Sequence, residues 1–198
     1  MLNFFSRHEI ICEQQSGFMK NYSTNLSIAK LLKKIVGGMD AKNIGLYVFL
    51  DLQKAFDLVY HSVLLRKLNY CGIRGNSNNL SGSFLADNDQ YVCLNNTSST
   101  VRSVHLGVPQ GSILSPLLFI IFINNIGNSS SILYFNLLAD DISLYLDSSN
   151  INIWKWSLNW KNYLIRSWLT NYLSTLKKLC ISFSLVKNYT SHFWTFFI

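Results

Sequence analysis

The sequence predicts an α+β fold in which helices pack on one face of an antiparallel sheet. Two observations support this prediction. Apolar residues recur at helical spacing in some segments and form short, nearly continuous runs in others. The predicted strands are joined both by tight turns and by helices. The chain of 198 residues is 49% hydrophobic and 14% charged, which is enough for a sizeable core and excludes disordered, collagen-like and coiled-coil classes.

The first third of the chain alternates between the two patterns. Residues 23–36 have helical spacing behind the potential N-cap Ser23, and the glycine pair that follows is expected to end this helix. Residues 45–50 are nearly continuously apolar and end at Asp51, which is typical of a buried strand. Helical spacing returns over residues 57–70, which predicts one continuous second helix.

The middle of the chain is less regular. Residues 76–89 are polar and poorly periodic, so no element is predicted there. Two strands are expected over 90–94 and 101–105, around a turn-rich segment. Residues 107–112 form a predicted loop, and the apolar run 113–126 is long enough for a buried helix.

The last predicted elements place two carboxylates side by side. Apolar runs over 132–138 and 142–146 are separated only by Ala-Asp-Asp, which predicts a tight β-hairpin with Asp140 and Asp141 at its tip. One more helix, over about 154–169, and a final strand are expected after the hairpin.

Charge is distributed unevenly along the chain. The formal net charge is +7. Residues 1–80 hold ten basic and five acidic residues, residues 81–150 one and five, and residues 151–198 six and none. A carboxylate-rich middle between basic flanks is consistent with a metal site beside a polyanion, although an ordinary solvated surface explains the same distribution.

Cysteines and targeting signals add little. The four cysteines are widely spaced without a CxxC pair, so buried free thiols are expected rather than a zinc site. Arg7, His8 and Glu9 stand where a signal peptide needs an apolar core. The longest apolar stretch, 117–123, is far short of the roughly 20 residues of a membrane span. The chain is therefore expected to be soluble and intracellular.

The strand ends carry the candidate metal ligands Asp51, Asp140 and Asp141. A carboxylate at the end of a core strand is costly to desolvate unless it is paired or bound to metal. Neighbouring aspartates repel one another, and Mg²⁺ relieves that repulsion. Such a cluster can hold two ions for in-line phosphoryl transfer. An Asp-Asp between strands is more often simply a turn, so the pair alone leaves both interpretations open.

Three sequence motifs, which follow one another along the chain, favour the metal site over a simple turn. They are residues 49–57 (FLDLQKAFD), 107–118 (GVPQGSILSPLL) and 138–141 (LADD). Together with residues 15–18 (QSGF), they closely resemble the reverse transcriptase domain of non-LTR retrotransposons, particularly the jockey-like group. The resemblance runs from about residue 11 to about residue 180.

The resemblance implies an RNA-directed DNA polymerase. It assigns Asp51, Asp140 and Asp141 as the catalytic ligands of two Mg²⁺ ions, with Mn²⁺ as a possible substitute. The implied partners are an RNA template with a DNA primer and deoxynucleoside triphosphates, with no membrane. The implied location is the nucleus or the cytoplasm, as for retrotransposon proteins.

The resemblance also implies nucleotide-binding residues. Phe56 would lie under the sugar and exclude a 2′-hydroxyl; this role is favoured over that of a core phenylalanine because its spacing from Asp51 matches the family. Gln110 and Gly111 would line the nucleotide and template pocket. Lys54 could meet phosphate, whereas Asp57 is favoured as the N-cap of the following helix.

Some positions depart from the family pattern. Two arginines of the family's first block are replaced by Met19 and Tyr22, and only Lys20 remains as a cation to bind nucleotide phosphates. This loss favours an alternative, a catalytically inactive relic that only binds nucleic acid. A third possibility, an RNA-templated RNA polymerase, conflicts with Phe56.

The implied architecture is the fingers-palm part of a polymerase, with an antiparallel palm sheet and a missing thumb. Residues 1–44 would be partial fingers, 45–75 the first part of the palm, 76–106 a fingers–palm connection, 107–186 the second part of the palm, and 187–198 an atypical tail.

Overall fold

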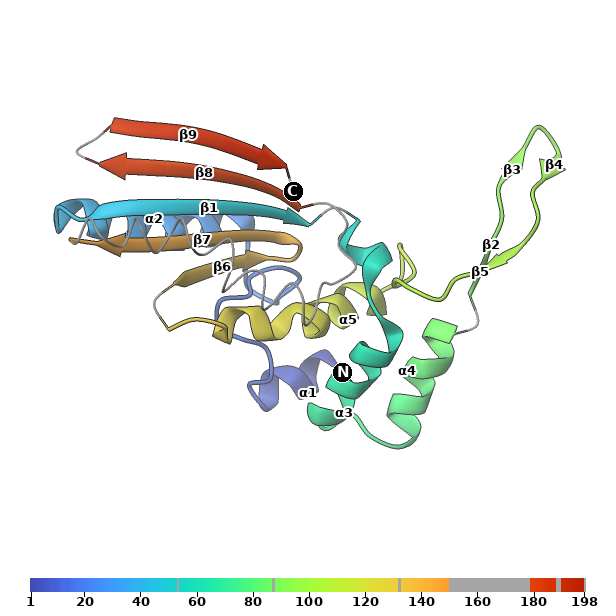
Figure 1. Cartoon of the computed structure of the whole chain (residues 1–198). Coiled ribbons are helices and arrows are strands. Elements are labelled where there is room, and N and C mark those ends of the chain that lie inside the picture. The colour runs from blue at the N-terminus through green and yellow to red at the C-terminus, as the bar shows by residue number, and fades with distance from the viewer. Residues whose placement is uncertain (53, 87, 132, 150–178, 188–189, 198) are drawn as a thin grey trace. The chain divides into compact units, whose positions relative to one another are not determined.

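A computed structural model describes residues 1–52, 54–86, 88–131, 133–149, 179–187 and 190–197 (Figure 1). The chain divides into two compact units. Unit 1 comprises Met1–Ile10 and Lys54–Ile123, and unit 2 comprises Ile11–Gln53 and Asn124–Ile198. Both contain helices and antiparallel strands, as the predicted α+β class requires. The helix expected over 154–169 lies outside the described residues.

Unit 2 is built on a five-stranded antiparallel sheet. Its strands are β6 (Tyr134–Leu138), β7 (Asp141–Ser148), β1 (Ile44–Leu52), β8 (Leu179–Lys187) and β9 (Thr190–Phe197), in that spatial order. The central strand β1 is therefore paired on both sides, and the predicted hairpin supplies β6 and β7 (Figure 1). Toward its end β1 alternates, with Leu50 and Leu52 buried and Phe49 and Asp51 exposed. The strand thus places the Asp51 carboxylate at an exposed position near its end.

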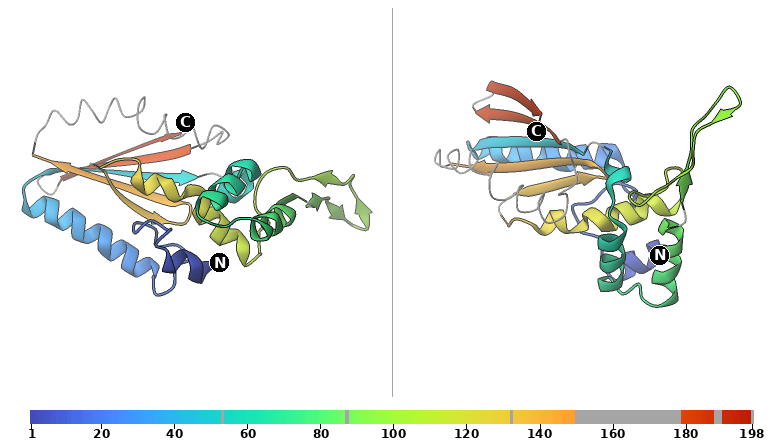
Figure 2. Two further views of the ribbon diagram at one scale, coloured as in Figure 1. Left: turned by 90° about the horizontal axis from the view of Figure 1, so that it is seen from below. Right: turned by 45° about the vertical axis from the view of Figure 1, so that its right-hand side comes forward.

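Helix α2 (Thr24–Asp40) packs against β1, β6 and β7 (Figure 2). The Ser23 side chain caps it as predicted, accepting a hydrogen bond from the Leu26 N–H at 3.2 Å. The helix does not end at its glycine pair, as expected from the sequence, but continues through it. A Cβ on Gly38 would lie 2.0 Å from the Tyr145 hydroxyl, so this glycine serves close packing on β7 rather than termination.

Unit 1 is mainly helical. Its elements are α1 (Leu2–Arg7), the 3₁₀ helix η1 (Ala55–Leu58), α3 (His61–Tyr70), α4 (Asn76–Ala86) and α5 (Leu114–Ile123). α3 contacts both α4 and α5. All of α5 from Leu118 onward is buried, which confirms the predicted core helix, although it ends at Ile123 and a 3₁₀ turn η2 (Asn124–Asn128) follows in unit 2.

The helix predicted over residues 57–70 is confirmed as α3, but it begins only at His61, because the chain breaks between η1 and α3. The Val59 carbonyl accepts a hydrogen bond from the Gly107 N–H at 2.8 Å, and Tyr60 forms a bridge with Leu106. These long-range backbone bonds replace the local bonds that a continuous helix would make. The polar segment after α3 forms the unpredicted helix α4, whose Ser81 hydroxyl donates to the Ser77 carbonyl.

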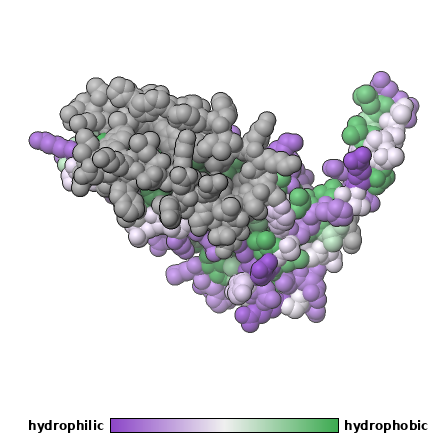
Figure 3. All heavy atoms as spheres, viewed as in Figure 1, coloured by the Kyte–Doolittle hydropathy of each residue, from purple (hydrophilic) through white to green (hydrophobic). Residues whose placement is uncertain are grey.

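The expected strands of the middle segment form a narrow ribbon within unit 1. β2 (Asp89–Gln90) pairs with β5 (Arg102–Ser103), and β3 (Cys93–Leu94) pairs with β4 (Thr97–Ser98). The ribbon carries exposed large apolar or aromatic side chains. Figure 3 shows green, hydrophobic areas among hydrophilic ones on this arm. The exposed side chains are Tyr91, Val92, Leu94 and Val101.

The cysteines correct a prediction of uniform burial. Among the described residues, Cys12, Cys71 and Cys93 are free thiols, as expected, but Cys12 and Cys71 are half-buried and Cys93 is exposed. Cys93 lies in β3, where two strands alone cannot bury a side chain on both faces. Burial raises the pKa of the Cys12 thiol. No helix within the described ranges is both long and apolar enough to cross a membrane.

Candidate active site

Three aspartates of unit 2, Asp51, Asp140 and Asp141, lie at one end of its sheet. In the β1–β7 ladder Asp51 lies directly opposite Asp141, and in the β6–β7 ladder Leu138 lies opposite Asp141. The hairpin turn therefore consists of Ala139 and Asp140 alone, and Asp141 is the first residue of β7 rather than a tip residue. Directly opposed residues of antiparallel strands point to the same face. Asp51 and Asp141 thus share one face, with Asp140 beside them.

The electrostatics of this sheet end reflect the crowding of like charges. Asp51 and Asp141 are exposed, and Asp140 is half-buried. The pKa of Asp141 is raised above its ordinary value, first by partial burial and then by the negative charges of Asp140 and Asp51. The part of this pKa shift that comes from the charges of Asp140 and Asp51 is the part that a bound cation would relieve.

The donor set matches a hard divalent cation, because Mg²⁺ and Mn²⁺ bind carboxylate oxygens. The backbone register brings the three aspartates to one sheet end, as a shared site requires. In the described part of the chain, however, no three His, Cys, Asp or Glu side chains converge as a complete metal-binding cluster. The chemistry of the residues fits the cation, while the side chains stand apart.

A segment that sequence analysis noted only as a family match lies against the same turn. The Gln15 side chain is 2% exposed, and its Oε1 accepts hydrogen bonds from the Gly17 N–H at 2.7 Å and the Ala139 N–H at 3.1 Å. Sequence analysis assigned Gln15 no role, because its partner Ala139 is 124 positions away. The only sequence signal was its place in the QSGF match.

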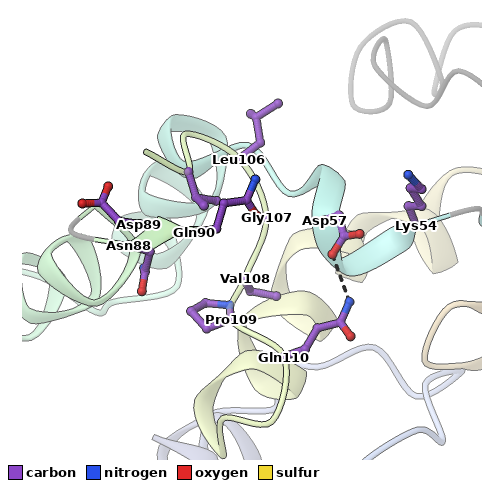
Figure 4. A pocket seen from close by; sticks show the side chains of 11 residues that line it. Lys54, Asp57, Asn88, Asp89, Gln90, Leu106, Gly107, Val108, Pro109 and Gln110 are labelled. Carbon is purple, nitrogen blue, oxygen red and sulfur yellow. Dashed lines mark hydrogen bonds between the residues drawn. The ribbon is translucent and has the colours of Figure 1, made fainter. Parts of the chain in front are cut away.

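The candidate nucleotide-binding residues Phe56, Gln110 and Gly111 belong to unit 1. The half-buried Phe56 ring stacks on Phe119, with centroids 4.5 Å apart and an interplanar angle of 22°. The exposed Gln110 amide donates to Asp57 Oδ1 at 3.0 Å (Figure 4). Gly111 is exposed, with φ +85°.

The N-cap role favoured for Asp57 is wrong. Helix α3 has Tyr60 as its N-cap, without a side-chain capping bond, and Asp57 lies inside η1. The Asp57 carboxylate accepts instead from Gln110, which sequence spacing did not reveal because the two residues are 53 positions apart.

A cavity of about 550 Å³ opens beside these residues within unit 1 (Figure 4). Gly107 stands at its wall with φ +92°, and a Cβ there would lie 2.9 Å from Asp57 Cα. His61 Nε2 lies 2.7 Å from the Gly107 carbonyl oxygen and braces the loop. The lining residues are Lys54, Asp57, Asn88, Asp89, Gln90, Val104, Leu106, Gly107, Val108, Pro109 and Gln110.

The remaining candidate cation, Lys20, is an exposed residue of unit 2. Tyr22 occupies one of the two positions where the family has arginine, and the ammonium group of a lysine lies over its ring. Lys30 Nζ lies 4.4 Å from the centroid of the Tyr22 ring, which is a cation–π contact. The contact joins Tyr22 to helix α2, to which Lys30 belongs.

Comparison with known protein sequences places these features in a family. The family model for "Reverse transcriptase (RNA-dependent DNA polymerase)" matches residues 1–187. A probable RNA-directed DNA polymerase from transposon BS of Drosophila melanogaster is 33% identical over 126 residues, which are 61% of this chain and 13% of the relative. The RNA-directed DNA polymerase from mobile element jockey of the same species is 30% identical over 115 residues, 54% of this chain and 12% of the relative. The chain thus spans only a small part of these relatives.

Solved structures agree on the fold. A telomerase from Candida tropicalis, in complex with a TWJ fragment of telomeric RNA, superimposes with a TM-score of 0.61 at 11% identity and covers 98% of this chain and 32% of that one. The Candida albicans telomerase gives 0.62 at 14% identity, covering 96% and 34%. At these identities the likeness concerns the fold alone. The family match over residues 1–187, with the transposon relatives, shows that this chain belongs to the reverse transcriptase (RNA-dependent DNA polymerase) family and is a jockey-like member of it.

Proposed function

We propose that this chain adds deoxynucleotides to a primer 3′-hydroxyl under the direction of an RNA template, at a two-metal carboxylate site. The observation that carries the proposal is the register that sets Asp51 opposite Asp141, with Asp140 in the adjoining turn. The raised pKa of Asp141 supports it, since repulsion among three carboxylates is relieved by divalent cations.

In this proposal Asp51, Asp140 and Asp141 hold two Mg²⁺ ions, which Mn²⁺ can replace. When bound, such ions activate the attacking hydroxyl and neutralise charge on the triphosphate. The protein contributes placement. The β1–β7 ladder fixes the spacing of Asp51 and Asp141, and the adjoining turn adds Asp140. Phosphoryl transfer of this kind depends mainly on positioning and charge neutralisation, which rigid strands provide.

The proposed nucleotide contacts are Phe56, Gln110, Gly111 and Lys20. Phe56 would exclude a 2′-hydroxyl from the sugar position, and its stacking on Phe119 gives the ring the fixed orientation that steric exclusion needs. Gln110 and Gly111 would present polar groups and open backbone to the nucleotide or template, and Lys20 would meet phosphate. The basic flanks of the sequence would bind the template–primer backbone in a salt-dependent way. The assignment to fingers, palm and connection belongs to the same proposal.

The test is primer extension on an RNA template with deoxynucleotides and Mg²⁺. We expect the chain to extend the primer and Asp140→Ala to lose at least about 100-fold in rate, because a lost metal ligand costs several kcal/mol of charge stabilisation. Asp147→Asn is the matched control. Asp147 lies on the same strand, β7, but accepts a hydrogen bond from Asn43 at 2.6 Å, which an asparagine oxygen can still accept.

Equal extension by the chain and by Asp140→Ala would contradict the proposal. No extension by either, with salt-sensitive binding of the duplex retained, would favour the alternative of an inactive nucleic-acid-binding relic. The comparisons do not favour that alternative, since the relatives named above are polymerases of mobile elements.

A further inference from the structure

The turn that carries Asp140 has an unfavourable residue at a position that requires positive φ. A two-residue hairpin turn needs positive φ at its first position, where Gly, Asn or Asp is preferred. Here that position is Ala139, with φ +58°. An L-residue with a Cβ is disfavoured in this left-handed conformation, because its Cβ crowds the following carbonyl oxygen. Ala139 is also 7% exposed, so its N–H needs a partner other than water. The turn therefore depends on contacts from elsewhere.

A short segment from the start of unit 2, residues 14–17, supplies those contacts. It runs parallel to β6, the edge strand of the sheet, with a bridge between Gln15 and Leu137. The Ser16 N–H donates to the Leu137 carbonyl at 2.8 Å, and the Leu137 N–H donates to the Gln14 carbonyl at 3.0 Å. The segment thus occupies the open side of the edge strand and fixes the register of Gln15 beside the turn.

Gln15 then closes on the turn itself. Its Oε1 accepts from the Ala139 N–H at 3.1 Å and from the Gly17 N–H at 2.7 Å, so one buried oxygen joins the segment to the turn. Gly17 allows this close approach, because a Cβ there would lie 2.3 Å from the Ala139 nitrogen. Gln15 Nε2 has no hydrogen-bond partner among the described residues. The hydrogen bonds that this side chain makes to the turn and to Gly17 are therefore made by its oxygen.

We propose that Gln15 is a positioning residue of the active site. Its carbonyl oxygen holds Ala139 in the left-handed conformation and thereby keeps Asp140 and Asp141 in register with Asp51. The inference rests on the proposed role of the three carboxylates in catalysis. It goes beyond that role in assigning the geometry of the catalytic turn to a side chain that touches neither metal nor substrate.

The first test is amide hydrogen exchange, measured by NMR on the intact chain. The Ala139 N–H lies in a turn, yet we expect it to be protected at least about tenfold relative to an unstructured peptide, as one buried hydrogen bond predicts. In Gln15→Leu this protection should fall about tenfold while that of Leu144, deep in β7, stays unchanged. Gln15→Glu retains an acceptor oxygen and should keep the protection.

The second test is kinetic. Gln15→Leu should lower kcat for primer extension about tenfold with little change in the KM for deoxynucleotides, because misplaced carboxylates affect the transition state. Gln15→Glu should restore kcat at least in part. Ser27→Ala is the matched control, since it removes another buried hydrogen bond of unit 2, from Ser27 Oγ to Asn136 Oδ1 at 3.0 Å, away from the turn. We expect it to leave kcat unchanged.

The two readouts separate this inference from the proposed function. If the Ala139 amide of the unmutated chain exchanges as fast as that of a free peptide, the positioning role is overturned, even where primer extension is robust. This measurement uses the unmutated chain, so it does not depend on whether a variant folds. If Gln15→Leu and Ser27→Ala lower kcat alike, or if Gln15→Leu accelerates exchange at Ala139 and Leu144 alike, Gln15 acts only on stability and the inference is wrong. Protection at Ala139 in a chain that extends no primer would confirm the turn contact and overturn its catalytic consequence together with the proposed function.

Discussion

The two turns that carry candidate functional residues keep their backbone conformations in different ways. In unit 1 the loop from Gly107 to Gly111 uses glycine at both positions of positive φ, +92° and +85°. In unit 2 the turn before Asp141 places Ala139 at φ +58° and relies on the buried oxygen of Gln15. Both turns make long-range contacts, but the first meets its positive φ values with glycines, whereas the second places an alanine there beside a side chain far away in the sequence. A change at the distant side chain should therefore alter the backbone conformation of the second turn more than that of the first.

The largest effect should come from Gly17, a residue outside the second turn. Gly17→Ala places a Cβ 2.3 Å from the Ala139 nitrogen, and a backbone atom cannot move aside cheaply. We expect a loss of about 3 kcal/mol in the free energy of unfolding, measured by urea denaturation. Gly37→Ala is the control, since nothing lies within 4 Å of its added Cβ inside α2, and it should stabilise by about 0.5–1 kcal/mol. Equal effects of the two changes would remove the steric basis of the comparison.

The next largest effect is expected from glycine substitutions inside the loop from Gly107 to Gly111. Gly107→Ala combines a left-handed conformation with a Cβ only 2.9 Å from the Asp57 backbone, and should cost about 2–3 kcal/mol of unfolding free energy. At Gly111 the added Cβ would meet nothing within 4 Å, so Gly111→Ala should cost about 1 kcal/mol, from backbone strain alone. Thermal or urea unfolding measures both. If Gly111→Ala proved the more damaging of the two, packing against Asp57 would not restrict the loop.

The same contrast explains what the sequence predicts. Features decided by neighbouring residues were predicted and are confirmed: the Ser23 cap of α2, the apolar core helix α5 and the hairpin of β6 and β7. The hairpin also brought Asp140 and Asp141 next to each other. Their pairing with Asp51 was inferred from family resemblance, because strand order cannot be derived from periodicity.

Features decided by distant residues escaped prediction. The break before α3 depends on Leu106 and Gly107, which bond to Tyr60 and Val59 across unit 1. Helix α4 escaped because its polar sequence has no amphipathic repeat. The contact of Gln15 with the turn escaped for the first reason. Conversely, helical spacing over residues 57–70 suggested one helix capped by Asp57. The structure instead has two elements there, η1 and α3, separated by long-range backbone bonds.

A smaller effect sharpens the comparison by making the second turn resemble the first. Ala139→Gly removes the left-handed penalty of about 1 kcal/mol, so the turn would no longer need Gln15 to hold its φ. In Gln15→Leu, adding Ala139→Gly should raise the population of the native turn roughly fivefold, measured by the amide chemical shifts of Asp140 and Asp141. If the double variant matches Gln15→Leu, backbone strain at Ala139 is not what Gln15 holds in place.

The smallest effect on stability should come from Gln110, whose exposed amide donates to Asp57 Oδ1 at 3.0 Å. An exposed hydrogen bond competes with water, so Gln110→Ala should change the unfolding free energy by less than about 0.5 kcal/mol, whereas Gln15→Leu leaves a buried N–H without its acceptor and should cost about 1–3 kcal/mol. Under the proposed function the two variants should change different kinetic constants. Gln110→Ala should raise the KM for deoxynucleotides with kcat retained, because this side chain would touch the nucleotide. Gln15→Leu should lower kcat with KM retained, because Gln15 acts through the turn. Primer extension at varied nucleotide concentration measures both constants. A shared drop in kcat would mean that the loop of unit 1 also acts by positioning, and the distinction between the two turns would then concern only how each is held.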